Sequence, residues 1–390
     1  MKTITKICLS LFAALLISSS AFSQDSTKTF TLSGSIDVYA RTSMATRNAY
    51  MANGEGDLTY GPSSAFAQLK GFSLGMANLI ASYNGEKAGF VADLVFGPRG
   101  QDAVFNGSPG VGSYTGQRII NQMYGYLKLS DAVTLNLGQF NTFLGYEVIS
   151  PTVNFHYSTS YLFSYGPFTH TGLRADFDFG NGLTGKLSVM NPTDMLEFNP
   201  VNTYTIGAQI GKTSDAGGVW LNIIYGDQDG KLDTDVDGDG DESAGALFQV
   251  DLTTGYNLSE TFYLGFNASY QTVGEGEVIV GDDVEDLGND ATSFVGFAVY
   301  PKLTLSETFS LGLRGEYFSI KKGHLGIFGL DDEGDGNVIA LTLSGNYKVG
   351  DLTLIPEIRM DKTSEDSFLK KDGEATDMMP SLTLAAVYKF

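Results

Sequence analysis

The sequence has little cysteine, proline or positive charge, and no long apolar run beyond its first segment. Its only cysteine, Cys8, lies near the N-terminus, so disulfides and thiol chemistry are excluded from the rest of the chain. No later stretch reaches roughly 18 consecutive apolar residues, which excludes transmembrane helices. Lys and Arg total 24 against 45 acids, and the net charge is −21. This balance argues against a nucleic-acid partner, because a phosphate backbone calls for a basic surface.

Glycine and aromatic residues are abundant instead. The chain has 48 Gly, only 10 Pro and 12% aromatic residues, a composition typical of many short strands joined by turns. Helices and closed barrels are the only structures that satisfy every backbone polar group in lipid. If this chain crosses a membrane, we therefore expect it to cross as a barrel.

The first 23 residues have the pattern of a secretory signal peptide. Lys2 and Lys6 form a basic start, an apolar run extends from Ile7 to Ile17, and Ala21-Phe22-Ser23 is a small-x-small cleavage site. The run of about 11 residues is too short to span a bilayer as a helix. A short N-terminal anchor is the alternative. Removal of these 23 residues, which carry two lysines and no acid, leaves 367 residues and changes the net charge from −21 to −23. We expect this remainder, 24–390, to form one domain.

Residues after the signal peptide can be divided into sixteen candidate strands. In one of them, Phe262, Leu264, Phe266, Ala268 and Tyr270 face one way, and Tyr263, Gly265, Asn267, Ser269 and Gln271 face the other. Segments 66–84 and 291–302 alternate poorly, so the count is about 16. The strands are 29–42, 66–84, 88–97, 119–130, 133–142, 168–179, 183–190, 202–211, 218–226, 245–258, 261–272, 291–302, 308–320, 337–348, 351–362 and 378–390.

The connections between these strands alternate in length. Short turns follow the even-numbered strands, whereas long polar segments follow the odd-numbered strands. The long segments are 43–65, 98–118, 143–167, 191–201, 227–244, 273–290, 321–336 and 363–377. Short turns on one rim and long loops on the other are the arrangement of outer-membrane barrels, with both termini in the periplasm. The fold class predicted is an all-β, antiparallel transmembrane barrel in a bacterial outer membrane, in contact with lipid and lipopolysaccharide.

The C-terminal strand supports this prediction. Leu382, Leu384, Ala386, Tyr388 and Phe390 fall on one face, and an apolar stripe with an aromatic pair at one end suits a sheet that meets lipid. A terminal Phe after such a stripe resembles the C-terminal signature of bacterial outer-membrane barrels. The resemblance implies that barrel-insertion machinery reads Phe390.

Acidic residues gather on two of the long connections. Segments 227–244 and 273–290 hold fifteen acids, and Lys231 is their only base. A third of the 45 acids therefore lie off the lipid-facing wall. A basic charge on that wall at the bilayer midplane costs about 2–4 kcal/mol, and an acidic one somewhat less.

One segment resembles a known family. From Gly138 to Gly172 the chain reads GQFNTFLGYEVISPTVNFHYSTSYLFSYGPFTHTG. The matching positions are Gly138, Gln139, Phe140, Gly145-Tyr146-Glu147, Tyr157-Ser158, Gly166-Pro167 and His170-x-Gly172. This segment is similar to the central signature of the OmpL-like β-barrel porin family, and the flanking strands resemble the family more loosely. The resemblance implies an outer-membrane porin for passive diffusion of small hydrophilic solutes and ions.

Segment 143–167 is the third long connection. In sixteen-stranded general porins the third loop folds inward and narrows the channel. We therefore expect a pore constriction lined by Tyr146, Glu147, Asn154, His156 and Tyr157, with Glu147 as its main fixed charge. An outward loop packed on its own aromatic residues is the alternative.

The faces predicted to point into the lumen carry charges of both signs. Seven acids against five bases favour weak cation selectivity, although structural pairs that brace the wall are an equal alternative. Arg314 with Glu316, and Glu357 with Arg359, are i, i+2 neighbours on one face. The acids are Asp37, Asp93, Asp176, Asp178, Asp251, Glu316 and Glu357; the bases are Arg41, Arg174, Lys186, Arg314 and Arg359.

Asp233, Asp235, Asp237, Asp239 and Asp241 have the spacing of oxygen ligands in a calcium loop. The bidentate Glu of an EF-hand is missing, because Ala244 stands at position twelve. Two interpretations remain: the acidic extracellular loop binds Ca at millimolar concentration, or it is a solvated acidic loop. No other cofactor is expected.

Two functions from other classes compete with the pore. A non-conducting barrel with an adhesive or structural surface role would use the acidic loops. An outer-membrane esterase would use His156 and Ser158 with Asn154, but no oxyanion pattern accompanies them. We expect no enzyme and no catalytic residue. A homotrimer, as in general porins, is possible, but the sequence contains no interface signal.

Overall fold

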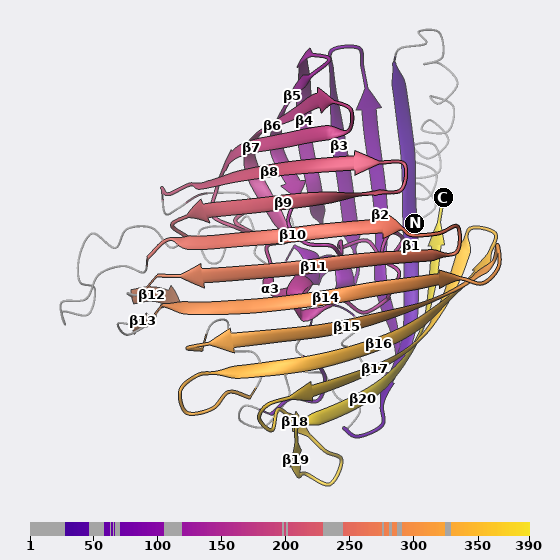
Figure 1. Cartoon of the computed structure of the whole chain (residues 1–390), viewed down its shortest axis with the longest axis vertical. Helices are drawn as coiled ribbons and strands as arrows, with labels where there is room; N and C mark the ends of the chain where they lie inside the picture. Colours follow the sequence, from indigo (N-terminus) through magenta and orange to yellow (C-terminus); the bar gives the residue numbers. More distant parts are fainter. Residues whose placement is uncertain are drawn as a thin grey trace, which may run out of the picture.

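Sixteen antiparallel strands close into one barrel in the computed structural model (Figure 1). The structure describes residues 28–46, 58–62, 64, 66, 71–104, 119–196, 199, 202–228, 245–274, 277–280, 283–286, 291–323 and 329–390. The barrel strands are β1 (Thr29–Ser43), β2 (Gly71–Asn84), β3 (Ala88–Phe96), β4 (Ile120–Ser130), β5 (Val133–Asn141), β6 (Thr169–Gly180), β7 (Leu183–Met190), β8 (Thr205–Ser214), β9 (Gly217–Gly226), β10 (Leu247–Asn257), β11 (Phe262–Val273), β14 (Thr292–Thr304), β15 (Phe309–Lys321), β16 (Gly336–Val349), β17 (Leu352–Thr363) and β20 (Met378–Lys389).

Each strand pairs with its neighbours in the sequence, and the first pairs with the last. The β1–β20 ladder runs from Ser35 opposite Lys389 to Ser43 opposite Ser381. Closure removes both edges of the barrel sheet, so none of its sixteen strands leaves a row of unpaired backbone groups. All sixteen predicted strands are confirmed. The largest difference is at 66–84, where the strand begins only at Gly71, opposite a β1 that carries a register shift between Ile36 and Val38.

The outer face of the barrel is apolar, as alternation along the strands predicts. On β20, Leu384 is 55% exposed while Ala385 is fully buried. Phe390 follows β20 and is 60% exposed, and its backbone N–H and C=O pair with Gly34. Side chains turned outward therefore suit hydrocarbon, and those turned inward meet the interior.

The two rims differ, as predicted. The short turns and both ends of the described chain lie on one rim, and the long connections lie on the other (Figure 1). Two of the long connections contain small hairpins: β12 (Glu277–Val280) with β13 (Asp283–Asp286), and β18 (Phe368–Leu369) with β19 (Ala375–Thr376). The described helices are α2 (Pro98–Ala103) and α3 (Tyr161–Tyr165), and neither has the length and apolar character to cross a bilayer.

The long-loop half of the barrel interior holds packed apolar side chains. Tyr161, Leu162 and Tyr165 of α3 pack against inward residues of β14, β15 and β16, including Phe318, which is fully buried. Phe163 packs on the opposite side, against the β2–β3 wall and α2. The segment between β5 and β6 thus lies inside the barrel, and α3 is visible within the ring of strands in Figure 1.

Candidate functional site: a loop folded into the barrel

The connection between β5 and β6, residues 142–168, crosses the barrel interior and binds the far wall. We call this segment the interior loop. Its backbone cannot form a ladder with the strands, so each buried amide needs another partner. Inward side chains of β15, β16 and β17 supply those partners, and the predicted inward fold of segment 143–167 is what the structure shows.

Two glutamates hold the interior loop by its backbone amides. Glu357 of β17 accepts from the N–H of Tyr157 at 2.8 Å and from that of Ser158 at 3.2 Å. Glu316 of β15 accepts from the N–H groups of Tyr161 and Leu162 at 3.0 and 2.8 Å. Both glutamates are buried, and each is 3% exposed. They act as clamps at either end of a short extended segment.

Arginines bind the carbonyl groups of the same segment. Arg314 of β15 donates to Ser158 O at 2.7 Å and to Thr159 O at 3.2 Å. Arg359 of β17 donates to Thr159 O at 2.8 Å. Arg314 also pairs with Glu147 of the loop at 2.7 Å. The wall therefore supplies acceptors for the loop amides and donors for its carbonyls.

Strand β1 and helix α2 hold the loop as well. The Tyr157 hydroxyl donates to Asp37 of β1, and Asp37 also accepts from the N–H of Met76 at 3.1 Å. Arg99 of α2 donates to Ile149 O at 3.0 Å and to Tyr157 O at 3.1 Å. The loop is thus attached to β1 and α2 as well as to β15 and β17, which limits how far it can move.

All the charges predicted to face the lumen lie on the inner faces of their strands. Most of them are buried and bonded to protein groups instead of to a water-filled bore. The buried ones are Asp37, Arg41, Asp93, Asp251, Arg314, Glu316, Glu357 and Arg359; Arg174, Asp176 and Lys186 are half-buried, and Asp178 is exposed near the short-turn end of β6.

The predicted i, i+2 ion pairs are corrected by the structure. Arg314 pairs with Glu147 and not with Glu316, because Glu316 accepts from the loop backbone. Arg359 pairs with Asp361 at 2.7 Å, and Glu357 again binds the loop. In both cases an arginine lies two residues away on the same strand face, but the glutamate accepts hydrogen bonds from two backbone N–H groups of the loop instead.

Three other predicted charges sit in clusters of amides or bases. Asp251 accepts from Asn222, Asn267 and Thr253 at 2.7–2.9 Å and from the N–H of Gly145 at 2.9 Å. Asp93 accepts from Asn78, Asn121 and Gln122. Asp176 pairs with Arg174 at 2.8 Å and with Lys186 at 3.5 Å. Asp251 and Asp93 therefore form no ion pair among the described residues.

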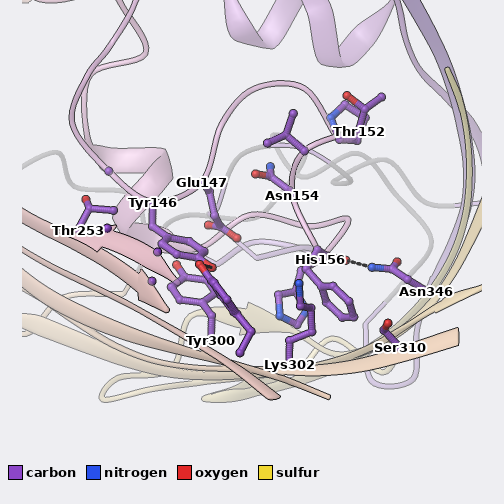
Figure 2. Close-up of a pocket in the computed structure, with 18 of the residues that line it drawn as sticks. Tyr146, Glu147, Thr152, Asn154, His156, Thr253, Tyr300, Lys302, Ser310 and Asn346 are labelled. Atoms are coloured by element: carbon purple, nitrogen blue, oxygen red, sulfur yellow. Dashed lines mark hydrogen bonds between the residues drawn. The ribbon is translucent and has the colours of Figure 1, made fainter. Parts of the chain in front are cut away.

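A cavity of about 950 Å³ lies between the interior loop and the short-turn rim. Its lining includes Gly350 and Asp351 at a short turn, and Thr253 and Tyr263 on β10 and β11. In Figure 2, Tyr146 and Tyr300 lie face to face below Glu147, and Lys302 rises between Tyr300 and Ser310. The two tyrosine ring centroids are 4.1 Å apart. The walls are mixed polar and aromatic, with space for a small solute.

Four of the five residues predicted for the constriction line this cavity: Tyr146, Glu147, Asn154 and His156. Tyr157 does not, because its ring is fully buried and its hydroxyl is bound to Asp37. The Glu147 carboxylate is almost wholly buried between Arg314 and the N–H of Ser160. Its role as the main fixed charge of a constriction remains a prediction, and its charge is matched by that of Arg314.

His156 and Ser158 do not form the pair that an esterase would need. His156 Nδ1 lies 2.8 Å from the Ser344 hydroxyl, which in turn donates to Glu357. Ser158 instead contacts Arg314 and Glu357. Burial, followed by the nearby Arg314, lowers the pKa of His156 well below its usual value. The imidazole is therefore neutral at pH 7 and has a structural partner.

The predicted calcium ligands Asp233, Asp235, Asp237, Asp239 and Asp241 lie outside the described residues. Within the part of the chain that the structure describes, no group of three or more His, Cys, Asp or Glu side chains has metal-site geometry. Calcium on the acidic loop therefore stays a prediction.

Sequence reasoning missed several residues of the site. Asp361 follows the predicted inner-face pattern of β17, where it binds Arg359, and the pattern could have found it. Lys302, Lys348 and Lys389 line the cavity and also lie on inner faces of predicted strands. The role of Arg99 could not be predicted, because this residue lies in a connection whose fold the strand pattern does not determine.

Comparisons with known proteins agree with this geometry. The chain matches the family described as "Putative beta-barrel porin-2, OmpL-like" over residues 29–390. No curated protein matches it significantly in sequence.

Solved structures of outer-membrane proteins share its fold. An OmpT variant of Vibrio cholerae lacking loop L8 is similar, with a TM-score of 0.58 and 11% identity, over 93% of this chain and 100% of the other. The outer membrane channel DcaP of Acinetobacter baumannii gives a TM-score of 0.57 at 14% identity, over 95% and 99%. OprB of Pseudomonas putida gives 0.53 at 13% identity, over 93% and 94%. At these identities the likeness shows the fold alone.

Proposed function

Because the chain belongs to the OmpL-like β-barrel porin family, we propose that it lets small hydrophilic solutes and ions diffuse passively through its barrel. Membership places it in the bacterial outer membrane. The observation that carries the proposal is the cavity of about 950 Å³, which has mixed polar and aromatic walls and lies beside a loop that crosses the bore. Solutes would pass along the polar inner face without a chemical step.

The interior loop would set the width of the path. Tyr146, Glu147, Asn154 and His156 are presented to the cavity by a segment whose backbone is clamped by buried carboxylates. A loop held in this way keeps a constant aperture, because moving it would leave buried amides and carbonyls without partners.

Ion preference would follow the charges that face water. Asp93 and Asp251 lie on the inner face and form no ion pair among the described residues, which supports a weak preference for cations. Lys302, Lys348 and Lys389 at the cavity oppose it. These opposing charges are the reason to expect the preference to be weak.

A non-conducting barrel is the second candidate, and one observation favours it. The long-loop half of the interior is filled by aromatic side chains around α3. If no path remains beside that core, the protein would serve an adhesive or structural role through its acidic loops.

Electrical recording separates the two candidates. Reconstituted in planar bilayers, a porin carries single-channel KCl current in discrete steps, and a filled barrel carries none. Liposome swelling with sugars of increasing size would then give the width. Absence of both current and swelling in verified, folded protein would overturn the porin proposal.

The surroundings of the barrel follow from its outer face. The exposed apolar residues would contact outer-membrane lipid, and the long-loop rim would meet lipopolysaccharide. A homotrimer, as in general porins, is part of this proposal, and light scattering of the detergent-solubilised protein tests it.

A further inference from the structure

Three lysines face the cavity from one side of the wall. Lys302 lies on β14, Lys348 on β16 and Lys389 on β20. Each stands at the short-turn end of its strand, on the inner face. Successive members are two strands apart, which corresponds to about 10 Å along the wall. The three ammonium groups therefore form an arc around part of the cavity.

These charges are not neutralised by the protein. Among the ion pairs of the described residues, none involves any of the three lysines. Two acids line the same cavity, and Glu147 is already bound by Arg314. Asp351 is thus the one acid left to oppose the three lysines in the cavity lining, so the cavity carries a net positive charge.

Aromatic rings cover another part of the cavity wall. Trp220 of β9 lies over Gly211 and Gly218, where a Cβ would collide with its indole ring. Tyr263 of β11 lies over Gly255 in the same way. Glycine at these positions lets the rings lie close to the wall, so that ring surface lines the cavity. Lys302 Nζ lies 4.8 Å from the Tyr263 ring centroid, so charge and ring surface meet at one place.

We propose that this cavity is a binding site for small aromatic carboxylates, entered from the short-turn side. The carboxylate would lie among the lysines, and the ring would pack against Trp220 or Tyr263. The proposal extends the proposed function, because the cavity lies in the bore that diffusing solutes would use. It adds a solute class to a pore for which charge counting predicts only a weak ion preference.

Trp220 is the chain's single tryptophan, so its fluorescence reports on this cavity. The probe is 4-nitrobenzoate, a quencher, and its neutral match is 4-nitrobenzamide. We expect the folded, detergent-solubilised protein to be quenched at about tenfold lower concentration by the anion. Replacing the lysines (K302Q, K348Q and K389Q together) should remove that difference. Lys212→Gln should keep it, because Lys212 is exposed on the outer face of β8.

Single-channel recording provides the second measurement. Nitrobenzoate added on the short-turn side should interrupt KCl current in the wild type and in Lys212→Gln. In the triple variant it should do so only at about tenfold higher concentration. If the triple variant is unfolded, the single Lys302→Gln variant is tested in its place, and a smaller loss in the same direction is expected.

The outcomes separate this site from the porin proposal. Equal quenching by the two probes in wild-type protein that conducts KCl would overturn the anion site and leave the porin intact. Preferential quenching by the anion in protein that does not conduct would overturn diffusion and retain the site. Preferential quenching that persists in the triple variant would also overturn the assignment to these lysines.

Discussion

Arg314 of β15 and Glu147 of the interior loop form an ion pair at 2.7 Å, with side-chain exposures of 0% and 3%. The two residues are 167 positions apart in the sequence. Breaking one partner of a buried pair is costly, since the remaining charge stays away from water. We expect Glu147→Gln to lower the free energy of unfolding by up to about 3–5 kcal/mol, measured by denaturation in detergent.

The same variant tests the predicted constriction. Without the Glu147 charge, Arg314 adds an unbalanced positive charge beside the bore, so reversal potentials in a KCl gradient should shift toward anions. Glu307→Gln is the control, because Glu307 is an exposed acid in a short turn. Unchanged conductance and ion selectivity in Glu147→Gln would remove the constriction role.

Release of the interior loop is the second prediction. Glu357→Ala leaves the amides of Tyr157 and Ser158 without their acceptor, and each buried group left unpaired costs about 1–3 kcal/mol. We expect a less stable protein whose single-channel current is larger and noisier, because the loop can leave the bore. Glu357→Gln retains one acceptor and should change both quantities less.

Glu365→Ala is the matched control for this change, since Glu365 is an exposed acid beyond the end of β17. A Glu357→Ala protein with wild-type current and noise would show that the clamp does not set the aperture.

Because the pKa of Asp194 is raised, we expect the stability of the protein to depend on pH. Asp194 stands between β7 and β8 and accepts from the N–H groups of Phe168 and Thr169 at 2.8 Å. Burial raises the pKa of Asp194 to about 6, and these hydrogen bonds oppose the shift. The folded state therefore binds the proton more tightly than the unfolded state, whose carboxyl has a pKa near 3.8.

The sign follows from proton linkage. Between pH 3.8 and about 6 the folded state holds more protons, so this group's contribution to stability falls as pH rises through that window. Asp194→Asn keeps the acceptor oxygen and tolerates the positive φ of 59° at this position. Unfolding midpoints of wild type and variant should be measured from pH 3.5 to 7. The midpoint of the wild type should fall relative to that of the variant as pH rises from 3.8 to about 6. Parallel curves would contradict the prediction.

Phe390 gives a prediction about assembly. Its ring is 60% exposed on the outer face, as is that of Phe179, so Phe390→Ala and Phe179→Ala should change the stability of the finished barrel to a similar extent. If insertion machinery reads this residue, Phe390→Ala should nevertheless lower the amount of barrel in the outer membrane. Phe179→Ala is the control, because Phe179 is equally exposed near a short turn. Equal membrane levels of the two variants would count against the signal.

Calcium binding to the acidic loop is tested with terbium. We expect directly excited terbium luminescence on the whole protein to fall when millimolar calcium is added. Asp235→Asn combined with Asp237→Asn should weaken the signal. Glu275→Gln combined with Glu277→Gln, in the other acidic connection, should not. Equal signals in both variants would favour a solvated acidic loop.

The barrel could be predicted from the sequence because the patterns that indicate it are local. Period-two alternation and the lengths of connections depend on neighbouring residues, and they located all sixteen strands within a few residues. Segment 66–84 was predicted to start five residues before Gly71, where the ladder with β1 begins opposite Arg41, because its poor alternation gives no sharp boundary.

The site could be predicted only in part, because its contacts are long-range. Alternation along the strands predicts that Glu316 and Glu357 point inward. It does not predict that they bind backbone amides of a loop some 150–200 residues earlier in the sequence. The same limit explains Tyr157: its position in the inward loop was predictable, whereas its bond to Asp37 depends on β1 lying close to the last strands in the closed barrel.

The clamps on the interior loop also imply an order of assembly. Tyr157 and Glu357 are separated by 200 positions, and the loop leaves the ribosome long before the strands that hold it. Until β15 and β17 are in place, its amides and carbonyls must remain solvated, because long-range contacts form only after the intervening chain has closed. Docking of the interior loop on the barrel wall is therefore a late event, completed only when the last strands join the first.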